Sequence, residues 1–355
     1  MTAVHAVLPD GIDDPARPSG GNVYDRRLCQ GLVALGWRVR EHEVTGSWPH
    51  PGVASLAALD GVLAQIPDGS VVLLDGLVAS TAPAVLVPHA RRLALVVLVH
   101  MPLGHRPGAG EADAVRKRER DVLSAAAAIL TTSLWTRRRL VELYGLPAER
   151  IHVAPPGVDA AALAAGTAAG DAFLCVAAVT SDKGHDVLVQ ALARIVDRSW
   201  RCACVGSLER DPQFAAGVRA HARNAGLGDR ISFPGPRTGA DLERSYDGAD
   251  LMVLPSRAET YGMVIAEALA RGLPVIASEV GGVPEALGHG ADGTRPGLLV
   301  ASGDAEALGD ALRTWLSEPA LRGRLRLAAR ERRGSLGRWP ATTSVVAGVL
   351  ARAAG

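Results

Sequence analysis

Several features are scarce in this sequence of 355 residues, and each scarcity excludes a class of protein. Cysteine occurs four times, too rarely and at positions too scattered for a disulfide scaffold. The formal net charge is only +1, which argues against a dedicated nucleic-acid-binding protein. The longest apolar runs, such as residues 93–99, are far shorter than the roughly 18 residues that span a bilayer. We therefore expect no transmembrane segment and no nucleic-acid partner.

The amino terminus also lacks a basic stretch followed by an apolar one, which would be typical of a secretory signal. A cytoplasmic location is the expectation. Hydrophobic residues make up 48% of the chain, enough to bury a sizeable core and to exclude wholesale disorder. The length predicts about two domains, at roughly 150 residues each. Cys202-Ala203-Cys204 lies in an expected strand with no further metal ligands nearby, so we interpret these cysteines as packing residues.

Lysine is almost absent: 36 of the 38 basic residues are arginine, and the exceptions are Lys117 and Lys183. Lys117 belongs to a charged helix face that needs no special role. Lys183 lies in the turn of residues 179–186, between an expected strand and an expected helix. A strand-to-helix turn of this kind often binds phosphate, so the turn predicts a phosphate contact by Lys183. In the alternative interpretation, Asp182 caps the helix and Lys183 is merely solvated.

Short apolar runs alternate with amphipathic stretches such as residues 187–195 and 305–316. This alternation predicts an α/β protein with parallel sheets covered by helices on both faces. The expected strands form two series. The first covers residues 4–8, 39–44, 71–74, 93–99, 129–132 and 151–154, and the second covers 173–177, 202–205, 231–233, 251–254, 275–277 and 298–300.

A segment rich in proline, glycine and alanine, from Pro155 to Gly170, separates the two series and reads as a linker. We expect an amino-terminal domain over residues 1–160 and a second domain over 171–335, both doubly wound and facing each other across a cleft. Residues 336–355 predict a final helix that packs back on the body. The arginine-rich stretch before it fits an amphipathic helix with a solvated basic face, and leaves peripheral contact with a membrane open.

Two carboxylates flank an expected helix start after the strand at residues 251–254. Glu259 precedes the helix, which we expect to begin near Tyr261 or Gly262, and Glu267 lies inside it. Free backbone N–H groups at such a helix start suit a diphosphate or sugar hydroxyls, and carboxylates accept hydrogen bonds from paired hydroxyls. The structural alternative makes Glu259 a helix cap and pairs Glu267 with Arg271, four residues later.

The first series of strands offers two further candidates. Gly20 and Gly21 lie between the first strand and an amphipathic helix, where they allow close approach of a backbone to an anion or sugar; a plain flexible turn is the alternative. His100 follows directly on residues 93–99, at the carboxyl end of a strand, where parallel sheets bind ligands. His105, five residues later, is the weaker candidate.

Together these residues resemble the family-4 glycosyltransferases of the GT-B fold, over nearly the whole chain. The most specific match is Pro255-Ser256 followed by Glu259 and Glu267, which is similar to the Glu-x7-Glu motif of that family. The supporting matches are Gly20-Gly21, His100, Pro156-Gly157-Val158-Asp159, Lys183-Gly184, Gly272–Ala277 and Gly281-Gly282-Val283-Pro284-Glu285.

The resemblance implies two Rossmann-like domains and transfer of a sugar from a nucleoside diphosphate donor with retention at the anomeric carbon. It implies that His100, Glu259 and Lys183 are catalytic, with Lys183 neutralising the diphosphate. Donor contacts would also come from Gly20, Gly21, Thr260, Tyr261, Gly262 and Glu267. No metal and no cofactor are expected. The family usually has an arginine five residues before the lysine, where this chain has Ala178, so another arginine such as Arg257 or Arg210 would replace its charge.

The sequence therefore predicts a retaining, metal-independent hexosyltransferase that acts on a small-molecule or lipid acceptor. Its few aromatic residues, 4% of the chain, do not define an acceptor pocket, and the base and sugar of the donor also stay open. Two alternatives are a catalytically weak homologue that binds nucleotide sugars and supports a partner enzyme, and a sugar-nucleotide epimerase on the same architecture.

Overall fold

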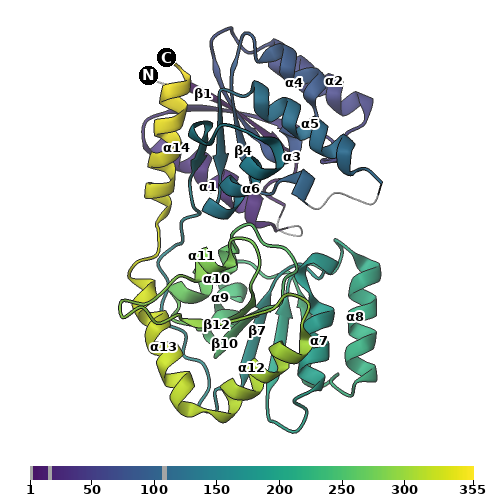
Figure 1. Ribbon diagram of the computed structural model, residues 1–355, viewed down its shortest axis with the longest axis vertical. Helices are drawn as coiled ribbons and strands as arrows, with labels where there is room; N and C mark the ends of the chain where they lie inside the picture. Colours follow the sequence, from purple (N-terminus) through teal and green to yellow (C-terminus); the bar gives the residue numbers. More distant parts are fainter. Residues whose placement is uncertain (1–2, 15–17, 106–109) are drawn as a thin grey trace. The chain divides into compact units, whose positions relative to one another are not determined.

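The computed structural model describes residues 3–14, 18–105 and 110–355 (Figure 1). The chain divides into two compact units. Unit 1 comprises the described parts of Met1–Asp13, Ser19–Gly157 and Gly337–Gly355, and unit 2 comprises Val158–Leu336 with the described residues of Asp14–Pro18. Each unit contains a six-stranded sheet, and every strand pair in both sheets is parallel. The α/β fold class predicted from the alternating pattern is confirmed.

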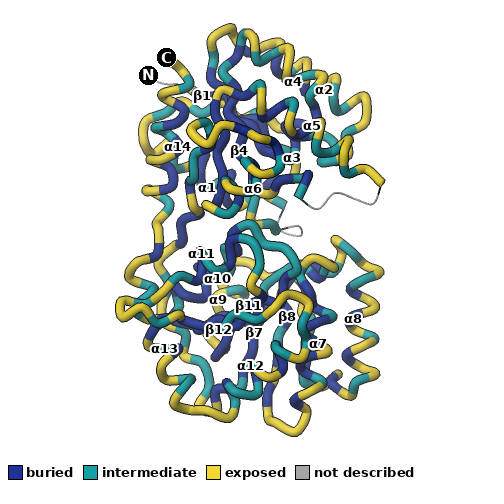
Figure 2. Tube along the Cα trace, in the orientation of Figure 1, coloured by how far each residue is buried: buried dark blue, intermediate teal, exposed yellow. Residues whose placement is uncertain are grey.

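The sheet of unit 1 has the strand order β2-β1-β3-β4-β5-β6. Its central strands β3 and β4 are buried along almost their whole length because helices cover both faces, as Figure 2 shows for β4. The edge strand β2 is largely exposed. The strands are β1 (Ala3–Pro9), β2 (Arg38–Val44), β3 (Val71–Asp75), β4 (Ala94–Val99), β5 (Ala128–Thr131) and β6 (Ile151–Val153).

The sheet of unit 2 has the order β12-β11-β10-β7-β8-β9, with an apolar core on each face. Its strands are β7 (Ala172–Val176), β8 (Arg201–Val205), β9 (Ile231–Gly235), β10 (Leu251–Leu254), β11 (Val275–Ser278) and β12 (Gly297–Val300). All twelve expected strands are present, within two residues at each end. The four cysteines are buried thiols, as expected for packing residues.

The helices begin and end at residues suited to those positions. Ser19 caps α1 by accepting a hydrogen bond from the backbone N–H of Asn22, at 3.1 Å, and Ser133 caps α6 in the same way. The helices of unit 1 are α1 (Gly20–Ala34), α2 (Val53–Ala64), α3 (Gly76–Ala79), α4 (Pro83–His89), α5 (Ala112–Ala125), α6 (Leu134–Tyr144) and α14 (Trp339–Ala353). Those of unit 2 are α7 (His185–Ala193), α8 (Pro212–Asn224), α9 (Gly239–Asp247), α10 (Met263–Ala270), α11 (Val283–Leu287), α12 (Ala305–Ser317) and α13 (Pro319–Arg333).

The segment expected to be a linker is fastened to unit 2 over most of its length. Val158 is buried in the core of that unit, and the backbone N–H groups of Ala164 and Gly166 donate to Arg271 and Asp247. The chain therefore leaves unit 1 at Gly157, and the alanine- and glycine-rich residues that follow are part of the second unit.

The last two helices belong to different units. The arginines of α13 mostly turn inward: Arg326 pairs with the buried Asp250, and Arg333 donates to the carbonyls of Ala270 and Ala161. Helix α14 instead packs beside α1 and the sheet of unit 1, where the Thr342 hydroxyl donates to the carbonyl of Pro155 at 2.7 Å (Figure 1). Among the described helices, none combines the length and the apolar character needed to span a membrane.

Candidate functional site

Lys183 and Glu259 meet in unit 2, at the edge of the sheet where β7 and β10 end. Lys183 Nζ lies 2.5 Å from Glu259 Oε1, and the Ser256 hydroxyl donates to the same oxygen at 3.0 Å. The side chain of Lys183 is 30% exposed and that of Glu259 is 10% exposed. Because the carboxyl ends of parallel strands bind ligands in open α/β sheets, this ion pair lies where a ligand is expected. The two residues come together from positions 76 residues apart in the sequence.

Glu259 belongs to the loop of residues 255–262, and three glycines allow this loop to pack tightly against its neighbours. A Cβ atom on Gly184 would lie 2.1 Å from the carbonyl oxygen of Pro255. On Gly281 it would lie 1.6 Å from the carbonyl oxygen of Glu259, and on Gly282 2.2 Å from that of Thr260. Any side chain at these positions would displace the loop that carries Glu259. The glycines next to Lys183 and at 281–282 thus fix the backbone around the ion pair.

Arg257 fastens the same loop to the start of α7. Its guanidinium binds both carboxylate oxygens of Asp186, at 2.8 and 2.7 Å, and donates to the carbonyl of Ser181 at 2.7 Å. Such a two-pronged pair is geometrically specific and neutralises both groups. Arg257 therefore supports the loop of Lys183, and its charge is already matched by Asp186. Arg210, the other arginine considered as a replacement at Ala178, is exposed.

Glu267 lies about one turn into α10, and its carboxylate is held by a tyrosine. The Tyr246 hydroxyl donates to Glu267 Oε2 at 2.6 Å, and Arg271 stacks over the tyrosine ring at 4.2 Å. Burial raises the pKa of Glu267, although Tyr246 and Arg271 oppose that shift. Arg271 donates to the backbone carbonyl of Glu267 and pairs with Glu243, so the alternative pairing of the two side chains at i, i+4 is wrong.

The remaining donor-site candidates of unit 2 lie between Glu259 and α10. Thr260, Tyr261 and Gly262 form an irregular stretch, and α10 begins at Met263, slightly later than expected. Gly262 has a φ of +88°, which an L side chain rarely adopts, so it turns the chain into the helix without strain. The first backbone N–H groups of α10 have no partner within the helix, as at every helix start.

In unit 1, Gly21 lies beside His100, and Gly20 precedes it in the chain. Both glycines belong to the first turn of α1, whereas the sequence placed them before the helix. A Cβ atom on Gly21 would lie 3.4 Å from His100 Cδ2, so the glycine leaves room for the imidazole ring. Tyr24 packs edge-on against the same ring, with 5.3 Å between the centroids. Two of the predicted residues, Gly21 and His100, are therefore neighbours at the carboxyl edge of this sheet.

Two aspartates complete this group, and neither is among the residues predicted from the sequence. His100 Nε2 lies 2.7 Å from Asp25 Oδ1 and 3.7 Å from Asp75 Oδ2. Both carboxyl groups are almost fully buried, 2% and 3% exposed. Burial lowers the pKa of His100, but the charge and hydrogen bond of Asp25 outweigh that effect and raise it to about 9. Burial and the neighbouring Asp25 raise the pKa of Asp75.

Of the residues that were not predicted, Asp75 and Asp25 could have been found from the sequence. Asp75 follows the apolar run of residues 71–74, as His100 follows residues 93–99, and the same argument applies to both. Asp25 lies on the apolar face of α1, between Leu28 and Gly21 at helical spacing, where a carboxylate needs a partner. Tyr246 gave no signal, because an aromatic residue on an amphipathic helix is usually a packing residue.

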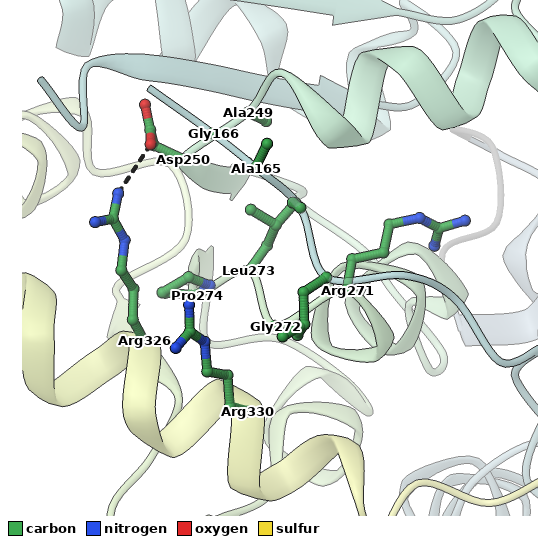
Figure 3. Close-up of a pocket in the computed structure, with 12 residues that line it drawn as sticks. Ala165, Gly166, Ala249, Asp250, Arg271, Gly272, Leu273, Pro274, Arg326 and Arg330 are labelled. Atoms are coloured by element: carbon green, nitrogen blue, oxygen red, sulfur yellow. Dashed lines mark hydrogen bonds and ion pairs between the residues drawn. The ribbon is translucent and has the colours of Figure 1, made fainter. Parts of the chain in front are cut away.

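The small cavity drawn in Figure 3 lies elsewhere, at the amino-terminal ends of β10 and β11. It holds about 70 Å³ and is lined partly by Asp250, Arg326 and Arg330. Asp250 is committed to structure: it pairs with Arg326 and accepts hydrogen bonds from Thr167 and the backbone N–H of Ala172. The residues around this cavity hold α13 and the segment that was expected to be a linker against the sheet. They lie at the edge opposite the Lys183–Glu259 pair.

Comparisons with solved structures define the class of protein. Sucrose-phosphate synthase from Thermosynechococcus elongatus superposes with a TM-score of 0.78 at 22% identity, covering 99% of both chains. Anabaena Alr3699/HepE in complex with UDP-glucose gives 0.78 at 17% identity, covering 98% of this chain and 99% of that one. At these identities the likeness concerns the fold, which is that of the GT-B glycosyltransferases.

Sequence comparisons identify the family. The model of glycosyl transferases group 1 matches residues 169–332, and the model of glycosyltransferase family 4 matches residues 18–162. This chain belongs to the family-4 glycosyltransferases, as the motifs around Glu259 and Glu267 predicted.

Named relatives agree with this assignment. The D-inositol 3-phosphate glycosyltransferase of Pseudarthrobacter chlorophenolicus is 29% identical, over 92% of this chain and 88% of the relative. That of Kineococcus radiotolerans is 33% identical over 66% of this chain. The match covers 59% of the Kineococcus protein and 49% of a third relative from Acidothermus cellulolyticus, so it spans about half the length of these two proteins.

Proposed function

We propose that this protein is a retaining glycosyltransferase that transfers a hexose from a nucleoside diphosphate sugar to a hydroxyl group of a small acceptor, without a metal ion. The observation that carries the proposal is the Lys183–Glu259 contact of 2.5 Å at the carboxyl edge of the unit 2 sheet. A cation and a carboxylate side by side match the two ends of a sugar diphosphate, one anionic and the other rich in hydroxyl groups.

Each residue has a role in this proposal. Lys183 exchanges Glu259 for the diphosphate and balances the negative charge that grows on the leaving group. Glu259 and the backbone of Thr260 to Gly262 receive the sugar hydroxyls, next to the positive end of α10. Glu267 keeps Oε2 on Tyr246 and offers Oε1 to the ribose hydroxyls. Gly20, Gly21 and His100 are the donor contacts that the family resemblance implies for unit 1.

The charge that Ala178 lacks falls to Lys183 in this proposal. Arg257, the nearer alternative, has its guanidinium closed by Asp186 and the Ser181 carbonyl. A single ammonium group together with helix amino termini then neutralises the diphosphate, where other enzymes use a metal ion. We expect EDTA to leave the rate unchanged.

A small polar acceptor is favoured over a lipid. Much of the basic face of α13 is used within unit 2, by hydrogen bonds of Arg322, Arg326, Arg332 and Arg333. The relatives named D-inositol 3-phosphate glycosyltransferase make inositol phosphates the first acceptors to assay. The cytoplasmic location stays a prediction.

The test is release of nucleoside diphosphate from UDP-glucose, UDP-N-acetylglucosamine and GDP-mannose, with and without D-inositol 3-phosphate. We expect acceptor-dependent release from at least one donor, loss of that release in Glu259→Ala, and an axial anomeric linkage in the product by NMR coupling constants. Glu306→Ala is the matched control, because Glu306 is an exposed glutamate paired with Arg194.

Other outcomes point to the alternative functions. In one such outcome the protein binds a donor yet releases nucleoside diphosphate from none of them, whether D-inositol 3-phosphate or a lipid extract is the acceptor. That result would indicate the catalytically weak homologue. Conversion of the donor sugar without an acceptor would indicate an epimerase. A product with inverted configuration would refute retention while leaving glycosyl transfer in place.

A further inference from the structure

In the buried cluster of Asp25, Asp75 and His100 in unit 1, one carboxylate oxygen lacks a hydrogen-bond donor among the described residues. Asp25 Oδ1 accepts the hydrogen bond of His100 Nε2, but Asp25 Oδ2 has no N–H or O–H partner among the described residues and is fully buried. A buried carboxylate oxygen without a donor is costly, so a native structure normally supplies one. The group beside it is a second carboxyl, that of Asp75, within hydrogen-bonding reach of Asp25.

Asp75 can supply that donor only if it carries a proton. Its Oδ1 accepts the backbone N–H of Leu77 at 2.6 Å and so caps the short helix α3. Its Oδ2 is 3.7 Å from His100 Nε2, too far for a hydrogen bond. Two ionised carboxylates in contact would repel each other, whereas one proton shared between them forms a strong O–H···O⁻ bond. A protonated Asp75 therefore satisfies every polar atom of the aspartate pair.

The histidine ring is held on its remaining sides. Gly21 allows close contact on one side, and Tyr24 packs against the ring at 5.3 Å. Tyr24 is itself fixed, because its hydroxyl donates to the carbonyl of Ala154 at 2.9 Å and Trp339 of α14 packs on its ring. Among the described residues His100 Nδ1 has no hydrogen-bond partner, and the side chain is 16% exposed.

We propose that Asp25 and Asp75 are positioning residues that share one proton and hold His100 as a fixed imidazolium, whose Nδ1–H donates to an oxygen of the sugar nucleotide. The substrate part of this inference rests on the proposed function, and the protonation state does not. Such a donor is charged and already oriented before substrate arrives, which is how a site stabilises developing negative charge most effectively. The ring gives up no proton in this role.

The surroundings of the ring support a cation. The titratable groups that face it in the described structure are Asp25 and Tyr24 from α1 and Asp75 at the end of β3. Asp25 raises the pKa of His100 through its charge and its hydrogen bond, and Asp75 adds to this effect only when it is ionised. The pKa of Tyr24 is raised by burial and by Asp25, so the phenol stays neutral. Gly21 and Trp339 bring no charge, and among the residues that the structure describes no basic side chain is paired with either aspartate besides His100.

Histidine NMR on the full-length protein without substrate tests the protonation state. The ring signals of His100 are assigned by their loss in His100→Gln and followed from pH 5.5 to 10. We expect the wild-type ring to stay charged until about pH 9 and the Asp25→Asn ring to titrate at a clearly lower pH, since the charge and the hydrogen bond of Asp25, which do most to raise its pKa, are then lost. In Asp75→Asn the ring should stay charged, because an amide donates to Asp25 Oδ2 as the acid does and still caps Leu77.

The outcomes separate the alternatives. A wild-type ring that titrates at or below 6.5 overturns the proposal. The proposal is also overturned if the pKa of the His100 ring falls by more than a unit in Asp75→Asn, because that would mean that Asp75 is ionised in the wild type. This second variant keeps the test valid even if Asp25→Asn does not fold. A ring that becomes insensitive to pH on adding Mg²⁺ or Zn²⁺, and recovers with EDTA, would assign the cluster to a metal instead. Asp304→Asn, which changes the cap of α12, is the control and should shift nothing.

The substrate part is read separately. Saturating UDP-glucose, UDP-N-acetylglucosamine or GDP-mannose should shift the His100 Nδ1 signal for each donor that supports transfer. A donor that is turned over without this shift overturns the substrate contact. If none of the donors is turned over, the proposed function fails while the pH titration still decides the charge of His100.

Discussion

The two units arrange their candidate residues in contrasting ways. In unit 1 the carboxyl groups of Asp25 and Asp75 are almost inaccessible behind His100, whereas in unit 2 Lys183 is 30% exposed and pairs with Glu259. A buried carboxyl can only be satisfied by a proton or a fixed donor, since water is excluded. A partly exposed ion pair can exchange its partners at modest cost. Unit 1 is therefore built to keep one charge state, and unit 2 to give up its contacts to a ligand.

The glycines show the same contrast. Gly21 leaves space for one ring, while Gly184, Gly281 and Gly282 bring three loops of unit 2 into backbone contact. The ion pair of unit 2 can exchange its partners because the backbone around it is fixed. The ring of unit 1 is instead fixed by side chains, through Tyr24 and the last helix.

The largest expected effect comes from Lys183. Lys183→Ala should lower kcat by about 10²- to 10³-fold, because one preorganised charge at the leaving group is lost and Ala178 offers no second cation nearby. The sequence provides a matched control in its only other lysine, Lys117, which forms an exposed pair with Asp121. Steady-state release of nucleoside diphosphate measures both. If Lys183→Ala and Lys117→Ala lowered kcat equally, the ion pair of Lys183 would have no specific role. The contrast between the two units would then not hold.

The next effect concerns pH and unit 1. With His100 charged up to about pH 9, the wild-type kcat/KM should not depend on this ring between pH 6.5 and 8.5. In Asp25→Asn the ring loses its proton at lower pH than in the wild type, so kcat/KM at pH 8 should fall at least 10-fold relative to its value at pH 5.5. Asp75→Asn should follow the wild-type profile. Parallel profiles for Asp25→Asn and the wild type would contradict the role of Asp25.

The strands, and the positions of Lys183 and Glu259 after two of them, could be predicted because local pattern determines them. Apolar runs mark the strands, and Lys183 and Glu259 lie directly after two of them. The pairing of Asp25 with Asp75 could not be predicted in the same way. It depends on α1 packing over the ends of β3 and β4, a tertiary contact between residues 50 positions apart. The positions of Gly20 and Gly21 inside α1 were missed because glycine weakens a helix interior, although the Ser19 cap compensates at the first turn.

A smaller effect compares two buried tyrosine–glutamate pairs, one in each unit. Tyr246 donates to Glu267 in unit 2, and Tyr144 donates to Glu119 in unit 1. Tyr246→Phe should raise the donor KM about 10-fold with little change in kcat, since a hydrogen bond is lost from Glu267, the carboxylate that we propose binds the ribose. Tyr144→Phe removes a similar bond from a glutamate that holds the backbone of Leu103 and Gly104, and should lower stability while leaving the donor KM unchanged. If KM rises in both variants, the effect of Tyr246→Phe comes from a general loss of stability and not from the lost hydrogen bond to Glu267.

The smallest expected effect is on stability, and it isolates the charge of His100. A histidine whose pKa is raised on folding contributes stability that is fully present below the unfolded value of about 6.5 and is lost as the pH rises through about 9. The thermal midpoint of the wild type should therefore fall, relative to that of Asp25→Asn, between pH 6.5 and 9. Each kcal/mol of this linkage corresponds to about 2–4 °C in a chain of this kind. Taking the difference between the two proteins cancels the titration of groups in unit 2, such as Glu267. A difference that stays constant with pH would show that the ring is neutral in the folded protein, and the contrast between a fixed charge in unit 1 and an exchangeable pair in unit 2 would no longer hold.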